Sequence, residues 1–131
     1  MVSLETAASQ LAALLAQDDA EVQAIVQDAL DDLEAGRPRE TLRKSVQVWE
    51  AGDLAELNRY LEWCDCDKTE RDRRLMKRVL DDRNPGLAQG IDALHAQGKR
   101  VFAAVGALHM IGPTGLPVLL AQRGYAVERL R

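Results

Sequence analysis

The sequence predicts a helix-dominated mixed α/β fold, in which about six helices precede a C-terminal strand–loop–helix–strand unit. Over most of the chain, apolar side chains recur every three or four residues, which is the period of an amphipathic helix. Near residue 100 this pattern changes to a short β-branched apolar run, which is typical of a buried strand. The length of 131 residues, with 47% hydrophobic and 29% charged residues, fits a single domain over residues 1–131.

Four helices are expected in the first half of the chain. Asp18 and Glu21 are placed like the pair of residues that starts a helix, here the second one. Gly52 lacks a Cβ and suits the C-terminal cap of the third helix, and Asp53 then starts the fourth, which Trp63 closes. The apolar stripes of these four helices lie within residues 4–15, 22–33, 42–49 and 54–61.

Two longer helices and the C-terminal unit complete the predicted order. One helix is expected over 69–82, and the next begins at Asn84 as its N-cap, has Pro85 in its first position and stops at Gly98. Strands are then expected over 101–105 and 125–130, joined by a glycine-rich loop over 106–115 and a short helix that Gly124 ends. This unit has the size of a βαβ motif.

Charge and cysteine content exclude several classes of protein. The net charge is −4, residues 1–36 carry eight acids and no Lys or Arg, and the basic stretch 68–83 is diluted by acids. With only 4% aromatic residues, a nucleic-acid groove is not expected. No apolar run is long enough to cross a membrane, and the first residues do not resemble a signal peptide. We expect Cys64 to be a buried apolar residue and Cys66 a loose thiol, because this spacing disfavours a disulfide on regular backbone.

His109 is the main candidate for chemistry. It lies in the glycine-flanked loop just after the first predicted strand, and ligands of open α/β sheets bind at that edge. Gly106 and Gly112 would let the backbone approach a ligand closely. An imidazole there can ligate a metal or move a proton, or it can simply donate one hydrogen bond to a loop carbonyl. The residues alone leave both interpretations open.

The run from Val105 to Leu116 resembles the C-terminal signature of the TraB/PrgY/GumN family, most closely its GumN-like bacterial branch. Three shorter pieces fit the same family in the same order, namely Leu4-Glu5-Thr6, Gly52-Asp53-Leu54 and Arg83-Asn84. The resemblance therefore covers essentially the whole chain. It implies a fold shared with the ChaN-like and erythromycin-esterase-like proteins, and the family includes the Tiki metal-dependent proteases.

The resemblance also implies that a part of the site is missing. Gly106-Ala107-Leu108-His109 matches the second of two Gly-x-x-His motifs in these relatives, and the first motif is absent. His95, the other histidine, lacks the preceding glycine and is expected to be exposed or to have a packing role. We therefore expect the C-terminal half of a TraB/GumN-like domain, from a parent protein that is a metal-dependent, peptidase-like hydrolase, exported or envelope-associated. A divalent metal is expected in the parent but not on this fragment, because a catalytic site needs about three protein ligands.

The remaining site residues follow from the same resemblance. Glu5 is a candidate catalytic carboxylate, with His109 as metal ligand, although an acid in a first helical turn is also ordinary. Arg83 is expected to pair with a carboxylate near the site or to bind a substrate carboxyl group, or else to lie on the surface. Asn84 is a substrate-binding candidate that also suits a helix cap. The alternative function is a non-catalytic binding or inhibitory module. Unpaired strand edges and uncovered apolar surface predict a homodimer.

Overall fold

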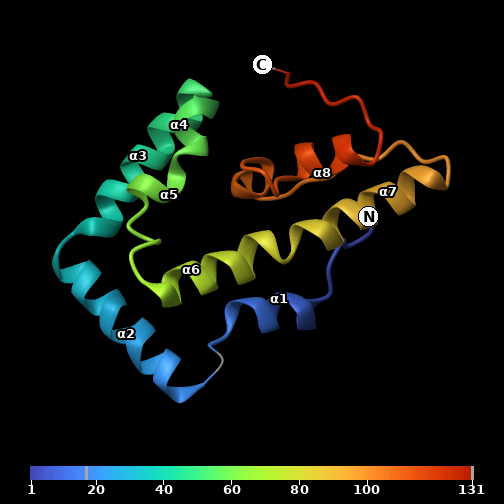
Figure 1. Cartoon of the computed structure of the whole chain (residues 1–131). Helices are drawn as coiled ribbons and strands as arrows, with labels where there is room; N and C mark the ends of the chain where they lie inside the picture. Colours follow the sequence, from blue (N-terminus) through green and yellow to red (C-terminus); the bar gives the residue numbers. More distant parts are fainter. Residues whose placement is uncertain (17, 131) are drawn as a thin grey trace.

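The computed structural model describes residues 1–16 and 18–130, and it is dominated by helices as predicted (Figure 1). The α-helices are α1 (Ala7–Leu14), α2 (Asp19–Glu34), α3 (Arg37–Ala51), α4 (Leu54–Asn58), α5 (Tyr60–Trp63), α6 (Glu70–Met76), α7 (Asn84–Ala96) and α8 (Leu116–Gln122). A π-helical turn (Lys77–Asp81) joins α6 to α7, and a 3₁₀ turn (Ala107–Met110) precedes α8. No helix in the described residues is long and apolar enough to cross a membrane.

The predicted starts and ends of the first helices are confirmed by their caps. The Asp18 carboxylate accepts a hydrogen bond from the backbone N–H of Glu21, 2.8 Å away, and so caps α2. Gly52 ends α3 in the left-handed conformation, with φ of 61°, and Asp53 caps α4. The predicted fourth helix is divided at Arg59 into α4 and α5.

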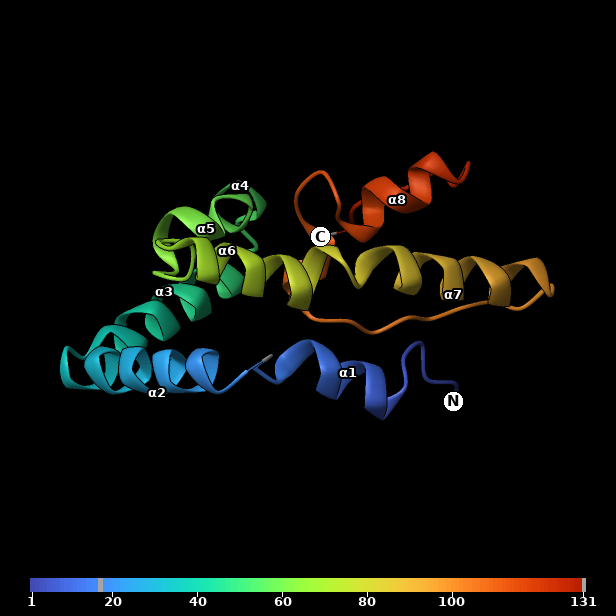
Figure 2. The same cartoon turned by 60° about the horizontal axis from the view of Figure 1, so that its bottom comes forward.

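The predicted stop before Asn84 is confirmed by a turn at residues 82–83, but the predicted N-cap role of Asn84 is wrong. Helix α6, the π-helical turn and α7 follow one another as one long rod, with α1 and α8 on opposite sides of it (Figures 1 and 2). Arg83 has helical dihedral angles, so Asn84 lies inside the helix and does not cap it. Its side chain is therefore free for tertiary contacts.

The two C-terminal strands are not formed. In the described residues, 101–105 and 125–130 have no regular structure and no strand pairs with them. Backbone hydrogen bonds to a neighbouring strand are what define a sheet, so a β-forming sequence without a neighbour stays unpaired. The short helix is confirmed as α8, and Gly124, with φ of 92°, follows its end.

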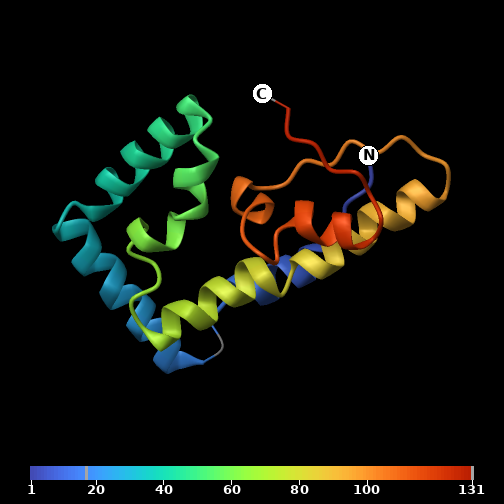
Figure 3. The same ribbon diagram turned by 45° about the horizontal axis from the view of Figure 1, so that its top comes forward.

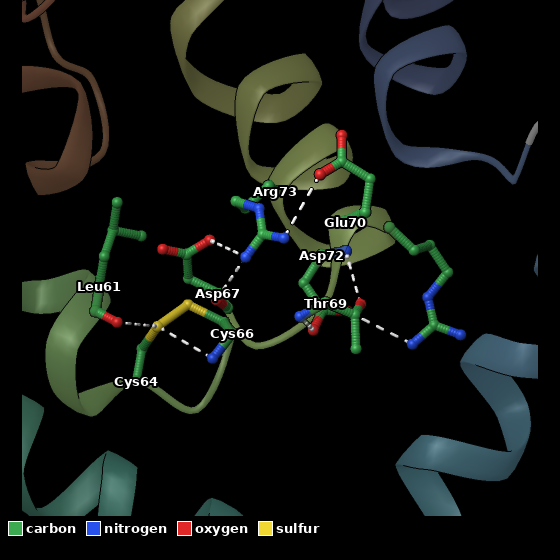
Figure 4. A network of polar contacts seen from close by, with 9 residues as sticks. Leu61, Cys64, Cys66, Asp67, Thr69, Glu70, Asp72 and Arg73 are labelled. Atoms are coloured by element: carbon green, nitrogen blue, oxygen red, sulfur yellow. Dashed lines mark hydrogen bonds and ion pairs between the residues drawn. A yellow bond between two sulfur atoms is a disulfide. The ribbon is translucent and has the colours of Figure 1, made fainter.

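The expectation of two free cysteines is also wrong, because Cys64 and Cys66 form a disulfide. It lies in the turn between α5 and α6 (Figure 4). The backbone at Asp65 adopts a positive φ of 62°, and this irregular turn brings the two Cα atoms to 5.1 Å. The prediction had assumed regular backbone, in which this approach does not occur.

The buried core is small and lies at one end of the molecule. Leu87 and Ala88 of α7 pack against Leu116 of α8, and partly buried apolar side chains surround them. The chain exposes 9580 Å² of surface, whereas a compact monomer of this size would expose about 6,900 Å². Many of the exposed large apolar side chains lie on α1, α2 and α3. Helices α3–α5 form an arm that α2 connects to α1 (Figure 3).

Candidate functional site

His109 is held in place by a short chain of buried hydrogen bonds. It lies in the 3₁₀ turn with only 6% of its surface exposed, and its Nδ1 is 2.6 Å from Oδ1 of Asn84. Asn84 is 1% exposed, and its Nδ2 donates to the carbonyl oxygen of Thr114 at 2.9 Å. Because Asn84 lies in α7, it ties both ends of the glycine-rich loop to the rod.

These contacts determine the tautomer of His109. A backbone carbonyl only accepts hydrogen bonds, so the Asn84 atom that faces Thr114 must be the amide nitrogen. Oδ1 then faces His109, and because Oδ1 only accepts, Nδ1 must carry the proton. Burial, with a smaller effect of the Arg83 charge, holds the pKa of His109 below its usual value and favours the neutral ring. Nε2 therefore keeps a free lone pair.

The free nitrogen is accessible. Every buried side-chain nitrogen and oxygen in the described residues has a hydrogen-bond partner, whereas Nε2 of His109 has none. It follows that Nε2 is not fully buried. His109 lines a pocket of about 630 Å³ together with Glu5, Arg83 and Phe102. The lone pair is thus available to a ligand in solution.

Glu5 and Arg83 form a two-pronged ion pair in the wall of the same pocket. Nε of Arg83 lies 2.8 Å from Oε1 of Glu5, and Nη2 lies 2.6 Å from Oε2. A third donor, Nη1, bonds the carbonyl oxygen of Val79 at 3.0 Å. The hydrogen bonds from Arg83 hold the pKa of the Glu5 carboxyl below its usual value, and those same bonds raise the pKa of Arg83. Both side chains are mostly buried, so this pairing is a built part of the pocket.

Glycine is required at one point of the loop for steric reasons. A Cβ on Gly115 would stand 2.9 Å from the carbonyl carbon of Ile111 and 3.0 Å from its nitrogen. Any side chain would therefore push the loop open and move the Thr114 carbonyl away from Asn84. Gly106 packs close to the His109 ring, since its Cβ would lie 3.7 Å from Cδ2.

A family model described as TraB/PrgY/gumN matches residues 1–129. The chain belongs to the TraB/PrgY/gumN family. No curated protein and no solved structure matches the chain. The family assignment therefore agrees with the resemblance that the glycine–histidine loop indicated, and the roles of the residues rest on the geometry alone.

Most of the residues singled out in this TraB/PrgY/gumN sequence come together. Glu5, Arg83, Gly106 and His109 line one pocket, and Asn84 contacts His109 behind it. Glu5 precedes α1 and its cap Thr6, so it is not a first-turn acid, and Arg83 is not a plain surface residue. The Nδ1–H group of His109 donates its hydrogen bond to Oδ1 of Asn84 and not to a loop carbonyl.

Two residues lie elsewhere. Gly112 does not line the pocket, and its N–H donates to Oδ1 of Asn58 at 3.2 Å. His95 is exposed on α7 and meets the Tyr125 ring edge-on, 5.2 Å between centroids, so the expected packing role is confirmed. The sequence analysis missed the role of the Thr114 carbonyl, because a backbone acceptor leaves no signal in the residue type.

The pocket fits a divalent metal only in part. The orientation of His109 fits, because a metal-binding imidazole usually donates its second N–H to an oxygen acceptor such as Asn84. The number of ligands is insufficient. Both oxygens of Glu5 are bound by Arg83, and the described residues contain no group of three His, Cys, Asp or Glu side chains that could hold a metal. Among the described side chains of the pocket, His109 thus offers one candidate metal-ligating atom, Nε2, and Glu5 offers none while Arg83 holds it.

Proposed function

We propose that this chain carries one half of the active site of a metal-dependent hydrolase that acts on peptide bonds. The observation that supports the proposal is the neutral His109, with Nδ1–H fixed by Asn84 and Nε2 open to the pocket. In this arrangement Nε2 serves as a metal ligand or as the group that accepts a proton. A bound metal would supply an activated water and polarise the scissile carbonyl.

The other residues of the pocket have binding and positioning roles in this proposal. Asn84 is a positioning residue, because it fixes the ring and the tautomer of His109. Glu5 and Arg83 present a nearly neutral, rigid pair, and Arg83 becomes available to a substrate carboxylate if the substrate displaces Glu5. The remaining ligands would come from a segment that carries the first Gly-x-x-His motif of the family.

The proposal is tested by joining the chain to such a segment. Peptidase activity would be measured with Zn²⁺, Mn²⁺ or Co²⁺ for the joined protein and for its His109→Ala variant, with His95→Ala as the matched control. We expect loss of activity in His109→Ala and retention in His95→Ala. Equal activity in the two variants would contradict the role of His109.

We also propose that the chain is the C-terminal half of a TraB/GumN-like domain of the ChaN-like fold. Residues 101–105 support this, because they are β-forming, make no backbone hydrogen bond with another described residue and include Phe102, which is 94% exposed. In the completed domain they would pair as a strand. Hydrogen exchange at 101–105 should then slow strongly when the other half is added, and unchanged exchange would oppose this proposal.

In the absence of that half, we propose that the chain forms a homodimer. The excess surface of roughly 2,700 Å² per chain is at the upper end of the about 1,000–2,500 Å² that each partner buries in an obligate interface. Its apolar part includes Leu30 and Leu33 of α2, which are 51% and 66% exposed. Sedimentation should give a dimer mass that falls to a monomer mass in a Leu30→Ser, Leu33→Ser double variant. A monomer mass for the unaltered chain would rule the dimer out.

A non-catalytic binding or inhibitory module is the second candidate. It is favoured by the ion pair, because Arg83 binds both carboxylate oxygens of Glu5. Among the described side chains of the pocket, this leaves Nε2 of His109 as the candidate metal ligand. In that case the joined protein would bind its partner equally well after His109→Ala and would retain no metal on purification.

A further inference from the structure

The disulfide between Cys64 and Cys66 has no part in the pocket or in the proposed hydrolase. It closes a ring of three residues in the turn that connects the α3–α5 arm to the long rod (Figures 1 and 4). It is the only disulfide in the described residues, and it stands at a joint between two parts of the molecule. Its position suggests a role in the geometry of that joint.

The backbone inside this ring is held in an unfavourable conformation. Asp65 has a φ of 62° and is the only residue other than glycine with a positive φ in the described part of the chain. Aspartate enters the left-handed region more readily than most L-residues, but its Cβ still approaches the following carbonyl oxygen there, which glycine avoids. Opening the ring would release Asp65 to an ordinary conformation. Reduction of this disulfide is therefore easier than reduction of one that closes relaxed backbone.

The charges around the ring connect it to α3. The Asp65 carboxylate pairs with Nε of Arg37 at 3.3 Å and with the Lys68 ammonium. These two cations offset the negative charge of the Asp65 carboxylate inside the ring. Arg37 is the first residue of α3, so a change at Asp65 is transmitted to the start of that helix.

The two sulfur atoms are not equivalent. Cys64 is 7% exposed, whereas Cys66 is half-buried. The backbone N–H of Cys66 donates to Sγ of Cys64 at 3.1 Å, which stabilises negative charge on that sulfur. An incoming thiolate thus meets the more open sulfur at Cys66 and leaves the better-stabilised thiolate at Cys64.

We propose that Cys64 and Cys66 are a reversible dithiol–disulfide couple that exchanges with small thiols and sets the geometry of the α5–α6 joint. The external thiolate bonds to Sγ of Cys66 while the bond between the two cysteines breaks, and Cys64 leaves as a thiolate that takes a proton from water. A second external thiolate attacks the external sulfur of this mixed disulfide and releases Cys66. Two external thiols are oxidised to one disulfide, and the protein disulfide is reduced to two thiols.

The couple is tested on the whole chain in graded mixtures of reduced and oxidised glutathione. Free thiols would be trapped with N-ethylmaleimide and counted by intact mass. We expect interconversion of the disulfide and two thiols within that range of mixtures. A disulfide that persists in the most reducing mixture, or thiols that persist in the most oxidising one, would overturn the proposal.

Substitutions at Asp65 separate backbone strain from charge. Asp65→Gly and Asp65→Val both remove the ion pairs, but glycine accepts a positive φ and valine does not. The equilibrium constant for forming the disulfide should be at least about fivefold higher in the glycine variant than in the valine variant. The same two substitutions at Asp67, next to the ring and held by Arg73 (Figure 4), are the matched control and should differ little. Equal ratios at the two positions would show that the ring stores no strain.

Single cysteine variants test the order of attack, and hydrogen exchange tests the effect on the joint. After each rate is divided by the thiolate fraction that its pH dependence gives, oxidised glutathione should modify Cys66 in Cys64→Ser faster than Cys64 in Cys66→Ser, because Cys66 is the more exposed residue. Reduction of the unaltered chain should speed amide exchange at 41–44, whose N–H groups bond the first carbonyls of α3, and leave exchange in α8 unchanged. Unaltered exchange at 41–44 would show that the disulfide does not control the joint, and a faster reaction at Cys64 would reverse the assignment of the attacked sulfur.

Discussion

The first three helices and the C-terminal pair α7 and α8 all have apolar stripes, but the stripes differ in how far they are buried. In α7 and α8, Leu87 and Leu116 are 3% and 2% exposed and face each other. In α2, Leu30 is 51% exposed and no residue of that helix is buried. An amphipathic pattern thus specifies a helix and its apolar face, whereas burial of that face requires a second surface that packs against it.

The largest expected difference between the two regions is in the cost of truncating a leucine. Leu116→Ala removes a side chain from the closed core and should lower the free energy of unfolding by about 2–5 kcal/mol. Leu30→Ala, the matched change on α2, should alter it by less than about 0.5 kcal/mol in the monomer. Urea unfolding at low protein concentration measures both. A comparable loss for Leu30→Ala would mean that α2 is covered in solution.

The second expected effect concerns the polar part of the C-terminal region. Asn84→Ala leaves the Nδ1–H of His109 and the Thr114 carbonyl without their buried partner, which should cost about 2–4 kcal/mol. Asn58→Ala is the control, because exposed Asn58 also bonds the loop, at Gly112, and should cost about 1 kcal/mol or less. Nitrogen NMR of His109 in Asn84→Ala should also show loss of the single tautomer. A single unchanged tautomer would mean that another group holds the ring.

The smallest expected effect is a pH dependence confined to the region that holds the site. The folded-state pKa of His109 lies below its usual 6.5, chiefly through burial, and that of Glu5 lies below its usual 4.5, chiefly through hydrogen bonds from Arg83. In both cases the unfolded chain binds the proton more readily, so stability is fully present above the unfolded pKa and falls as pH decreases through the folded one. Stability should therefore fall first below about pH 6.5 and again below about pH 4.5.

Two variants separate these steps. His109→Asn should remove the first step and Glu5→Gln the second, each leaving the other in place. Denaturant midpoints between pH 4 and pH 8 give the profile, and hydrogen exchange locates it in α7 more than in α2. A profile that both variants leave unchanged would show that other groups control the acid sensitivity.

The residue pattern was sufficient for the helices and for the family. Caps at Asp18, Gly52 and Asp53 act over a few residues, so the sequence specifies them without knowledge of the rest of the fold. The glycine–histidine loop also indicated the family, because its spacing is local. Residues 101–105 were different, since their β-forming composition requires a partner strand that the described chain does not supply.

What only the tertiary structure decided is which distant groups meet. The sequence alone indicated Glu5, Arg83, Asn84 and His109 as candidate site residues. It did not indicate that Arg83 binds Glu5, 78 residues away in the chain, or that Asn84 fixes the tautomer of His109. It also favoured a cap for Asn84 and free thiols at residues 64 and 66, and both expectations assumed regular local backbone. Hydrogen bonds between distant segments and the positive φ of Asp65 depend on how the whole chain packs, and residue type alone does not predict that packing.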